Sequence, residues 1–155
     1  MKAILNFYRL AAAKLSLLQS PFLLLVRVYW GLQFMQTGWG KMHNVPKFTN
    51  YFASLNIPFP AFNAHFVAGV EFFGGLLLLV GLASRLAGLL LAGNMLVAYW
   101  TSEHDALVSL FKDPLGGKFY AVDPYTFLFA SVMVLIFGAG LFSLDALLAR
   151  RMKED

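Results

Sequence analysis

Four apolar segments, each close to 20 residues long, constrain this chain more than any other feature. They cover residues 21–41, 62–82, 85–101 and 125–147. About 20 apolar residues in a helix span the roughly 30 Å hydrocarbon core of a bilayer. Hydrophobic residues make up 59% of the 155 residues and charged residues only 13%, which is too little polar surface for a water-soluble globule. We therefore predict an all-α, integral membrane four-helix bundle.

Composition narrows the class further. The chain has no cysteine, which excludes disulfides, thiolate nucleophiles and cysteine-ligated metal clusters. No Ser/Pro-rich linker or low-complexity tract divides it, so we predict one membrane domain over residues 1–155. The formal charge is +4, but the basic residues flank the apolar segments and form no stripe between aromatic residues. We expect the lipid bilayer as a partner and no nucleic acid.

The basic residues also predict an orientation. Lysine and arginine in short flanking segments favour the cytoplasmic side of the membrane. One side would carry Lys2, Arg9, Lys14, Arg85, Arg150, Arg151 and Lys153. The other would carry Lys41, Lys47, Lys112 and Lys118. The larger group predicts a multi-pass protein of the inner (plasma) membrane with both termini in the cytoplasm.

Short helices are expected outside the four spans. In the N-terminal segment, apolar residues such as Ile4 and Tyr8 alternate with Arg9 and Lys14, as in an amphipathic helix on an anionic surface. A plain extension of the first membrane helix fits the same residues. Apolar residues also recur at helical spacing in both predicted outer loops. We predict short interfacial helices in the N-terminal segment and in these loops.

Three polar residues of the apolar segments are the first candidates for function: Arg27, Glu71 and Asn94. An ionised group near the bilayer centre costs several kcal/mol without a partner or water. Counting about 1.5 Å per residue puts the three at similar depths in the inner half of the membrane. We predict that Arg27 pairs with Glu71, that Asn94 adds a hydrogen bond, and that the three form a polar cluster or line a ligand site.

Two alternatives to this pairing stay open. Side chains lean toward the N-terminus of their helix, which would turn Arg27 and Glu71 in opposite directions along the membrane. Arg27 could then reach the interface by snorkelling, or contact water or a ligand. The pair could serve function or only hold helices together, and no residue is identified as catalytic.

The outer half of the first segment holds two further candidates, Gln36 and Lys41. They could meet the outer loops, and a quinone ring could lodge there among Trp30, Phe34 and Trp39. The alternative is an aromatic belt with a snorkelling lysine. We expect no metal site, because His43, His65 and His104 come from separated segments without a ligand spacing.

Small residues and capping residues predict local contacts. We expect the glycines to allow close approach of helices; they are Gly31, Gly38, Gly69, Gly74, Gly75, Gly138 and Gly140. Near the C-terminus, Asp145 is expected to cap or start a short cytoplasmic helix, with Ser143 as the alternative cap.

Three stretches resemble one known family. They are "LLLVRVYWGLQFMQTGWGK", "GVEFFGGLLLLVGLASRLAGLLLAGNMLVA" and "FLFASVMVLIFGAGLFSLDALL". The chain resembles the DoxX/DoxD-like family of small membrane proteins with four transmembrane helices. The resemblance extends over about residues 22–148 and includes the intramembrane Arg27 and Glu71.

The resemblance implies a four-helix bundle and work around membrane redox chemistry. Some members of the family are subunits of a thiosulfate:quinone oxidoreductase, and others are linked to sulfur metabolism or oxidative stress. It therefore implies a non-autonomous subunit of a membrane redox system, with quinone as a candidate cofactor and a soluble or membrane redox protein as partner. A non-enzymatic scaffold or assembly factor is the alternative. Assembly into a homo-oligomer stays open.

Overall fold

A computed structural model describes residues 2–153, apart from the side chains of residues 2, 3 and 10–13. The described chain is helical, without strands. Its elements are α1 (Lys2–Leu17), α2 (Gln19–His43), α3 (Val45–Ser54), α4 (Pro60–Val80), α5 (Ser84–Thr101), α6 (His104–Lys112), η1 (Lys118–Tyr120), α7 (Pro124–Phe137) and α8 (Leu144–Arg151). The predicted all-α fold is confirmed.

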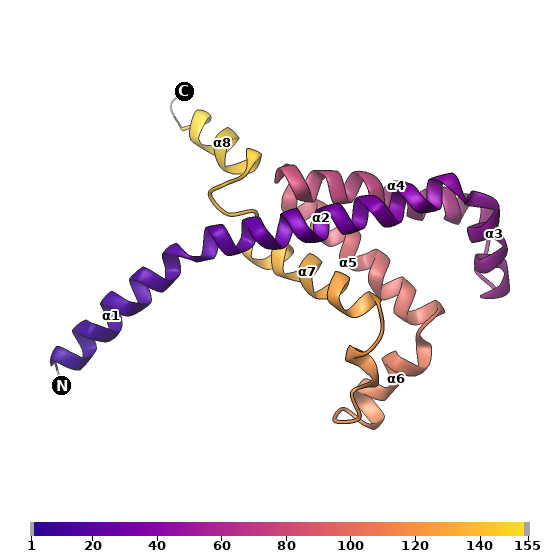
Figure 1. Ribbon diagram of the computed structural model, residues 1–155, viewed down its shortest axis with the longest axis horizontal. Helices are drawn as coiled ribbons and strands as arrows, with labels where there is room; N and C mark the ends of the chain where they lie inside the picture. Colours follow the sequence, from indigo (N-terminus) through magenta and orange to yellow (C-terminus); the bar gives the residue numbers. More distant parts are fainter. Residues whose placement is uncertain (1, 154–155) are drawn as a thin grey trace.

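The helices α2, α4, α5 and α7 pack together as a bundle (Figure 1). Each helix packs closely on a neighbour, α2 on α4 and α5 on α7, and α4 also packs on α5. The short elements α3, α6 and η1 lie at one end of this bundle, which we call the cap end. The helices α1 and α8 leave from the opposite end, the terminal end, where both chain termini lie.

Glycines let α2 and α4 approach each other closely. A Cβ atom added at Gly38 would lie 2.4 Å from the backbone nitrogen of Phe72. At Gly31 it would lie 2.9 Å from the carbonyl oxygen of Gly75. Only residues without a side chain permit backbones this close. The expected role in helix contact is confirmed for these glycines, but it is wrong for Gly69, beside which lies open space.

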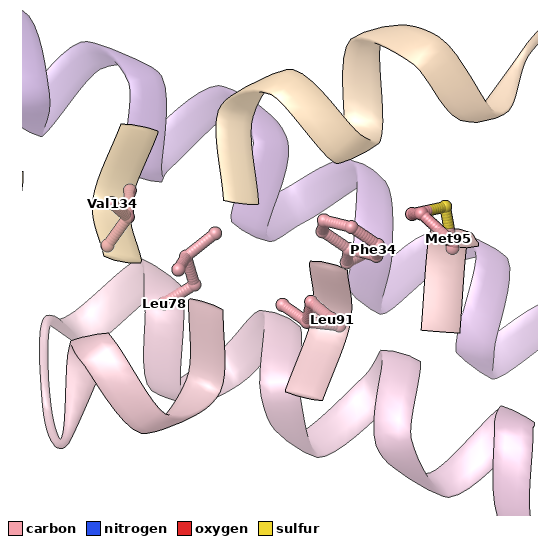
Figure 2. Close-up of a cluster of buried hydrophobic side chains, with 5 residues drawn as sticks. All are labelled: Phe34, Leu78, Leu91, Met95 and Val134. Atoms are coloured by element: carbon pink, nitrogen blue, oxygen red, sulfur yellow. The ribbon is translucent and has the colours of Figure 1, made fainter. Parts of the chain in front are cut away.

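One apolar cluster draws on all four bundle helices (Figure 2). It contains Phe34 of α2, Leu78 of α4, Leu91 and Met95 of α5, and Val134 of α7. Four of these side chains have no exposed surface, and Met95 is 7% exposed. The bundle therefore shares a single packed centre, against which the functional side chains are positioned.

The predicted spans agree with the structure at three helices and fail at the fourth. The helices α2, α4 and α5 each begin and end within two residues of the predicted 21–41, 62–82 and 85–101. The helix α7, predicted over 125–147, ends at Phe137. Gly138 and Gly140 both adopt a φ of +76°, a left-handed conformation that takes the chain out of an α-helix. Both glycines thus lie in a loop. A Cβ atom added at Gly140 would still lie 3.2 Å from the Cα of Ser20 on α2, so the expected close approach fails only at Gly138 of these two.

Short helices form at both ends, as the sequence predicted. The helix α3 follows α2 after Asn44 and carries a proline in its first turn, where a missing N–H costs nothing. Among the described residues, two helical stretches are long and apolar enough to cross a membrane. They are Ile4–His43, which contains α2 and most of α1, and Pro60–Val80. The helix α7 is apolar but shorter.

Candidate functional site

A buried carboxylate held by two partners forms the centre of the candidate site. Glu71 of α4 is only 3% exposed. Its Oε2 forms an ion pair with Nζ of Lys41 on α2, and its Oε1 accepts a hydrogen bond of 3.1 Å from Nδ2 of Asn94 on α5. Three helices therefore meet at one polar group. Within the part of the chain that the structure describes, this is the one salt bridge between side chains.

Helix direction explains why Lys41 reaches Glu71. Lys41 lies in the last turn of α2, and side chains lean toward the start of their own helix, so Lys41 leans into the bundle. The helix α4 runs antiparallel to α2, and Glu71 leans toward the start of α4 at the cap end. The two side chains converge from opposite directions. A carboxylate with both oxygens occupied by an ammonium group and an amide loses much of its desolvation cost.

Two cavities flank this ion pair. The first has a volume of about 210 Å³ and lies between α3, α4 and α5. Its apolar walls include Tyr51, Phe52, Leu55, Val67 and Val97. The second has a volume of about 250 Å³ and lies between α2, α5 and α7, with Thr37, Phe34, Met95, Asp123 and Phe127 on its walls. Lys41 and Glu71 line both cavities, so one charged pair stands between two apolar-walled spaces.

This arrangement offers specific chemistry to a ligand. Lys41 presents an ammonium donor, Asn94 an amide, and Glu71 an acceptor that can also hold a proton. Apolar walls with a few convergent polar groups are typical of small-molecule sites. The arrangement suits a flat apolar ring that carries hydrogen-bonding oxygens at its edge.

Arg27 does not join this site, and the predicted pair between Arg27 and Glu71 is wrong. The Arg27 side chain is completely buried. Its Nη2 donates to the carbonyl oxygen of Phe142 at 2.5 Å, and its Nη1 donates to those of Leu78 and Leu79 at 3.4 and 3.5 Å. These carbonyls belong to the last turn of α4 and to the 138–143 loop, whereas Glu71 lies two turns earlier on α4. Because the side chain is buried, it does not snorkel either.

Asp145 joins two helices at the terminal end. Its carboxylate accepts hydrogen bonds from the backbone N–H groups of Ala83 at 2.7 Å and Ser84 at 2.9 Å, where α5 begins. The cap of α8 is Ser143, whose Oγ accepts a hydrogen bond from the Ala146 N–H at 3.1 Å. Ser143 is therefore the cap of the short helix. Asp145 lies in the first turn of α8, as predicted for a residue that starts this helix, and its carboxylate caps α5 instead.

Hydrogen bonds set the protonation state of Asp145. Burial by itself would raise the pKa of the Asp145 carboxyl. The hydrogen bonds from Ser84 and Ala83, together with the positive charge of Arg27, outweigh burial and hold this pKa below its ordinary value. Asp145 is therefore a stable anion over the physiological pH range.

The remaining candidates divide between the site and the surface. Lys41 lies in the site, but Gln36 is exposed and lines an open groove with Asn44 and Lys47. Neither Trp30 nor Trp39 is among the residues that line the two cavities. The wall that α3 contributes to the first cavity was not among the predicted site residues. Its signal was the helical spacing of apolar residues over 45–55, which predicted the helix but not what it covers.

Comparison with known proteins places the chain in a family. The family model described as DoxX matches residues 22–104, more than half of the chain. The chain belongs to the DoxX family. The match covers α2 to α5 and thus Lys41, Glu71 and Asn94. DoxX proteins are membrane proteins, so the apolar outer faces of these helices contact a lipid bilayer.

A curated relative of this DoxX protein is the Bacillus subtilis (strain 168) protein named "Putative oxidoreductase CatD". The two are 32% identical over 117 residues, which cover 67% of this chain and 86% of the relative. No solved structure matches the chain.

Proposed function

We propose that this DoxX protein is a non-autonomous subunit of a quinone-linked redox system in the inner (plasma) membrane. One observation carries the proposal: an ion pair of the half-buried Lys41 with the buried Glu71 stands between two apolar-walled cavities. The name of the Bacillus relative, "Putative oxidoreductase CatD", supports the redox class. A sulfur-related or oxidative-stress-related pathway is the setting that the family resemblance favours.

The residues of the site suit a quinone head group. Lys41 Nζ and Asn94 Nδ2 are donors suited to a carbonyl oxygen, and Glu71 is an acid that can give or take the accompanying proton. Each cavity is smaller than the roughly 300–1,000 Å³ of drug-sized ligand sites, which favours a single ring over a large cofactor. A bound quinone supplies two-electron, two-proton redox chemistry.

The electrons need a second protein. The chain has no cysteine, so it carries no thiol couple of its own. A partner oxidoreductase, soluble or in the membrane, would exchange electrons with a quinone held by Lys41, Glu71 and Asn94. This is why we propose a subunit and not a self-sufficient enzyme.

The test is to purify the protein from gently solubilised membranes and to extract and identify bound quinone and co-purifying proteins. We expect quinone to accompany the wild type. Lys41→Met and Glu71→Gln should each lower its retention about tenfold or more, because each removes a hydrogen bond involving a charged group. The matched control is Lys112→Met, an exposed lysine away from both cavities, which should retain quinone. Absence of quinone and of quinone-dependent turnover with any co-purifying protein would contradict the proposal.

A second candidate is a membrane scaffold or assembly factor without chemistry of its own. It is favoured by an apolar groove of about 370 Å³ between α4 and α5, where Gly69, Gly74 and Ala87 leave room beside the helices. Small residues of this kind let another membrane helix approach closely. In that case pull-down recovers membrane subunits, and the swapped pair Lys41→Glu with Glu71→Lys keeps function. With a quinone site, the swapped pair loses function.

A further inference from the structure

Two helices at the terminal end carry apolar side chains that the bundle does not cover. In α1, Ile4 is 74%, Tyr8 69% and Leu15 65% exposed. In α8, Leu147 and Leu148 are 49% and 47% exposed. Figure 1 shows that both helices leave the bundle at the same end and diverge from it. We call α1 and α8 together the terminal helix pair.

Several exposed apolar residues of α1 share one face of the helix. Ile4, Tyr8 and Leu15 are separated by four and seven residues, which places them on one face of an α-helix. Asn6 and Arg9 lie on the opposite face by the same geometry, and that face also carries Leu17 at the end of the helix. An amphipathic helix of this kind suits the boundary between water and the acyl chains of a membrane.

The length of α2 places α1 outside the hydrocarbon core. The 25 residues of α2 extend about 37 Å, which already exceeds a core of about 30 Å. The helix breaks at Leu18, so that α1 runs in a different direction (Figure 1). If α1 stood in water, its large apolar side chains would remain exposed. A surface that covers the apolar face of α1 therefore has to lie beside the terminal end of the bundle.

The charge of the terminal end indicates which kind of surface covers the apolar face of α1. The sequence of α1 contains no acidic residue, and its Arg9 and Lys14 are exposed. Exposed Arg150, Arg151 and Lys153 lie at or just after the end of α8, and in the sequence Glu154 and Asp155 follow them. The nearby Asp145 carboxylate is occupied by the backbone N–H groups that begin α5. The terminal helix pair thus combines apolar contact with positive charge.

We propose that the terminal helix pair lies in the headgroup layer of an anionic phospholipid surface. The apolar face of α1 enters the acyl boundary, and Arg9, Lys14 and the basic residues after α8 contact lipid phosphates. Each basic residue near an anionic surface strengthens attachment about fivefold at moderate salt. Together, the two helices attach the terminal end to the negatively charged leaflet. This interaction does not depend on the quinone site.

The natural absence of cysteine makes a direct test available. Single cysteines are introduced in the full chain as Ile4→Cys or Asn6→Cys and are labelled with an environment-sensitive fluorophore. The labelled proteins are reconstituted in vesicles of phosphatidylcholine alone or with about a third phosphatidylglycerol. With anionic lipid, we expect the label at residue 4 to shift to the blue and to resist an aqueous quencher, and the label at residue 6 to remain accessible.

Charge variants test the electrostatic contribution. Arg9→Gln with Lys14→Gln should weaken attachment of α1 about 25-fold, two basic residues at about fivefold each, and so restore quenching of the label at residue 4. The matched control neutralises two exposed lysines at the cap end, Lys112→Gln with Lys118→Gln, and should leave the label protected. High salt should act like the Arg9 and Lys14 changes.

Three outcomes would overturn the proposal. Equal quenching of the labels at residues 4 and 6 in both lipids would place α1 in water. Equal protection at residue 4 with and without anionic lipid would show insertion without recognition of charge. Protection that appears only with a bound protein would make the terminal helix pair a protein interface.

Discussion

Arg27 acts as a cation at the end of a helix. Its guanidinium contacts the carbonyl oxygens of Leu78 and Leu79 in the last turn of α4, where carbonyl groups have few partners within the helix. The Leu78 carbonyl oxygen also accepts a hydrogen bond of 3.2 Å from the Gly81 N–H. The same group donates to Phe142 in the 138–143 loop. A positive charge near a helix C-terminus is also favoured by the helix dipole. Arg27 thus ties α2, α4 and the loop after α7 together.

Replacing Arg27 tests this structural role. Arg27→Met should lower the free energy of unfolding by at least about 2 kcal/mol, because it removes hydrogen bonds from a charged donor to buried carbonyls. Arg27→Lys should recover only part of the loss, since an ammonium group lacks the planar fork of a guanidinium. Thermal unfolding in detergent measures both. Full stability of Arg27→Met would contradict the role.

The separation of Arg27 from Glu71 makes a second prediction. Glu71→Ala leaves the Lys41 ammonium without its partner and should cost about 3–5 kcal/mol of stability. Lys41→Met combined with Glu71→Gln should cost less than Glu71→Ala alone, because no buried charge remains. By contrast, the losses from Arg27→Met and Glu71→Ala should add, since the two residues share no partner. A double-mutant cycle by thermal unfolding distinguishes these cases, and coupling between Arg27 and Glu71 would contradict the structure.

Among the bundle helices, α2 and α4 form the tightest contact. Gly38 and Gly40 lie on the same helix, but only Gly38 faces the α4 backbone. Gly38→Ala should destabilise the protein by roughly 1–3 kcal/mol, because an added methyl group overpacks the contact. Gly40→Ala meets nothing within 4 Å and should be neutral or stabilising by up to about 1 kcal/mol, given the low helix propensity of glycine.

Comparison of the two alanine variants by thermal unfolding controls for helix propensity. Equal effects of the two changes would mean that α2 and α4 do not pack as described. A larger effect at Gly40 would mean the same.

The junction of α8 with α5 predicts a pH dependence. Because the pKa of Asp145 is lowered in the folded protein, its contribution to stability is present above its unfolded pKa of about 3.9. The contribution is lost as the pH falls through the folded value. Between neutral pH and this acid range, the backbone N–H groups of Ala83 and Ser84 should become less protected from hydrogen exchange.

Asp145→Ala supplies the comparison for this prediction. It should remove the pH dependence and cost about 1 kcal/mol, as for loss of a helix cap. Hydrogen-exchange mass spectrometry of the 81–86 segment measures both effects. Unchanged pH dependence in Asp145→Ala would assign it to another group.

For the molecule as a whole, both termini lie at one end of the bundle. We predict that this end faces the cytoplasm, since basic residues concentrate there. A reporter that is active only in the cytoplasm should be active when it is fused to the C-terminus. A reporter that is active only on the outer side of the membrane should be inactive at the same position. The reverse result would invert the orientation and would move the site from the outer half of the membrane to the inner half.

Much of the architecture was predictable from local patterns. Apolar length located α2, α4 and α5 within two residues, because each helix carries its own span and its own end signals. The end of α7 was not predictable from apolar content. The stretch from Phe137 to Leu141 remains apolar, yet the chain leaves the helix at Gly138 with positive φ. Hydropathy does not distinguish an apolar loop packed on Arg27 from a further turn of helix.

The candidate site, like the fold, was predictable from the sequence only in part. The sequence by itself determined that Arg27, Glu71 and Asn94 are costly inside a membrane and therefore need partners. Only the tertiary structure decided the partners: Lys41 and Asn94 for Glu71, and backbone carbonyls for Arg27. The physical reason is that depth along a helix follows from residue number, whereas pairing depends on helix direction, rotation and side-chain lean. These are set when four helices pack around one core.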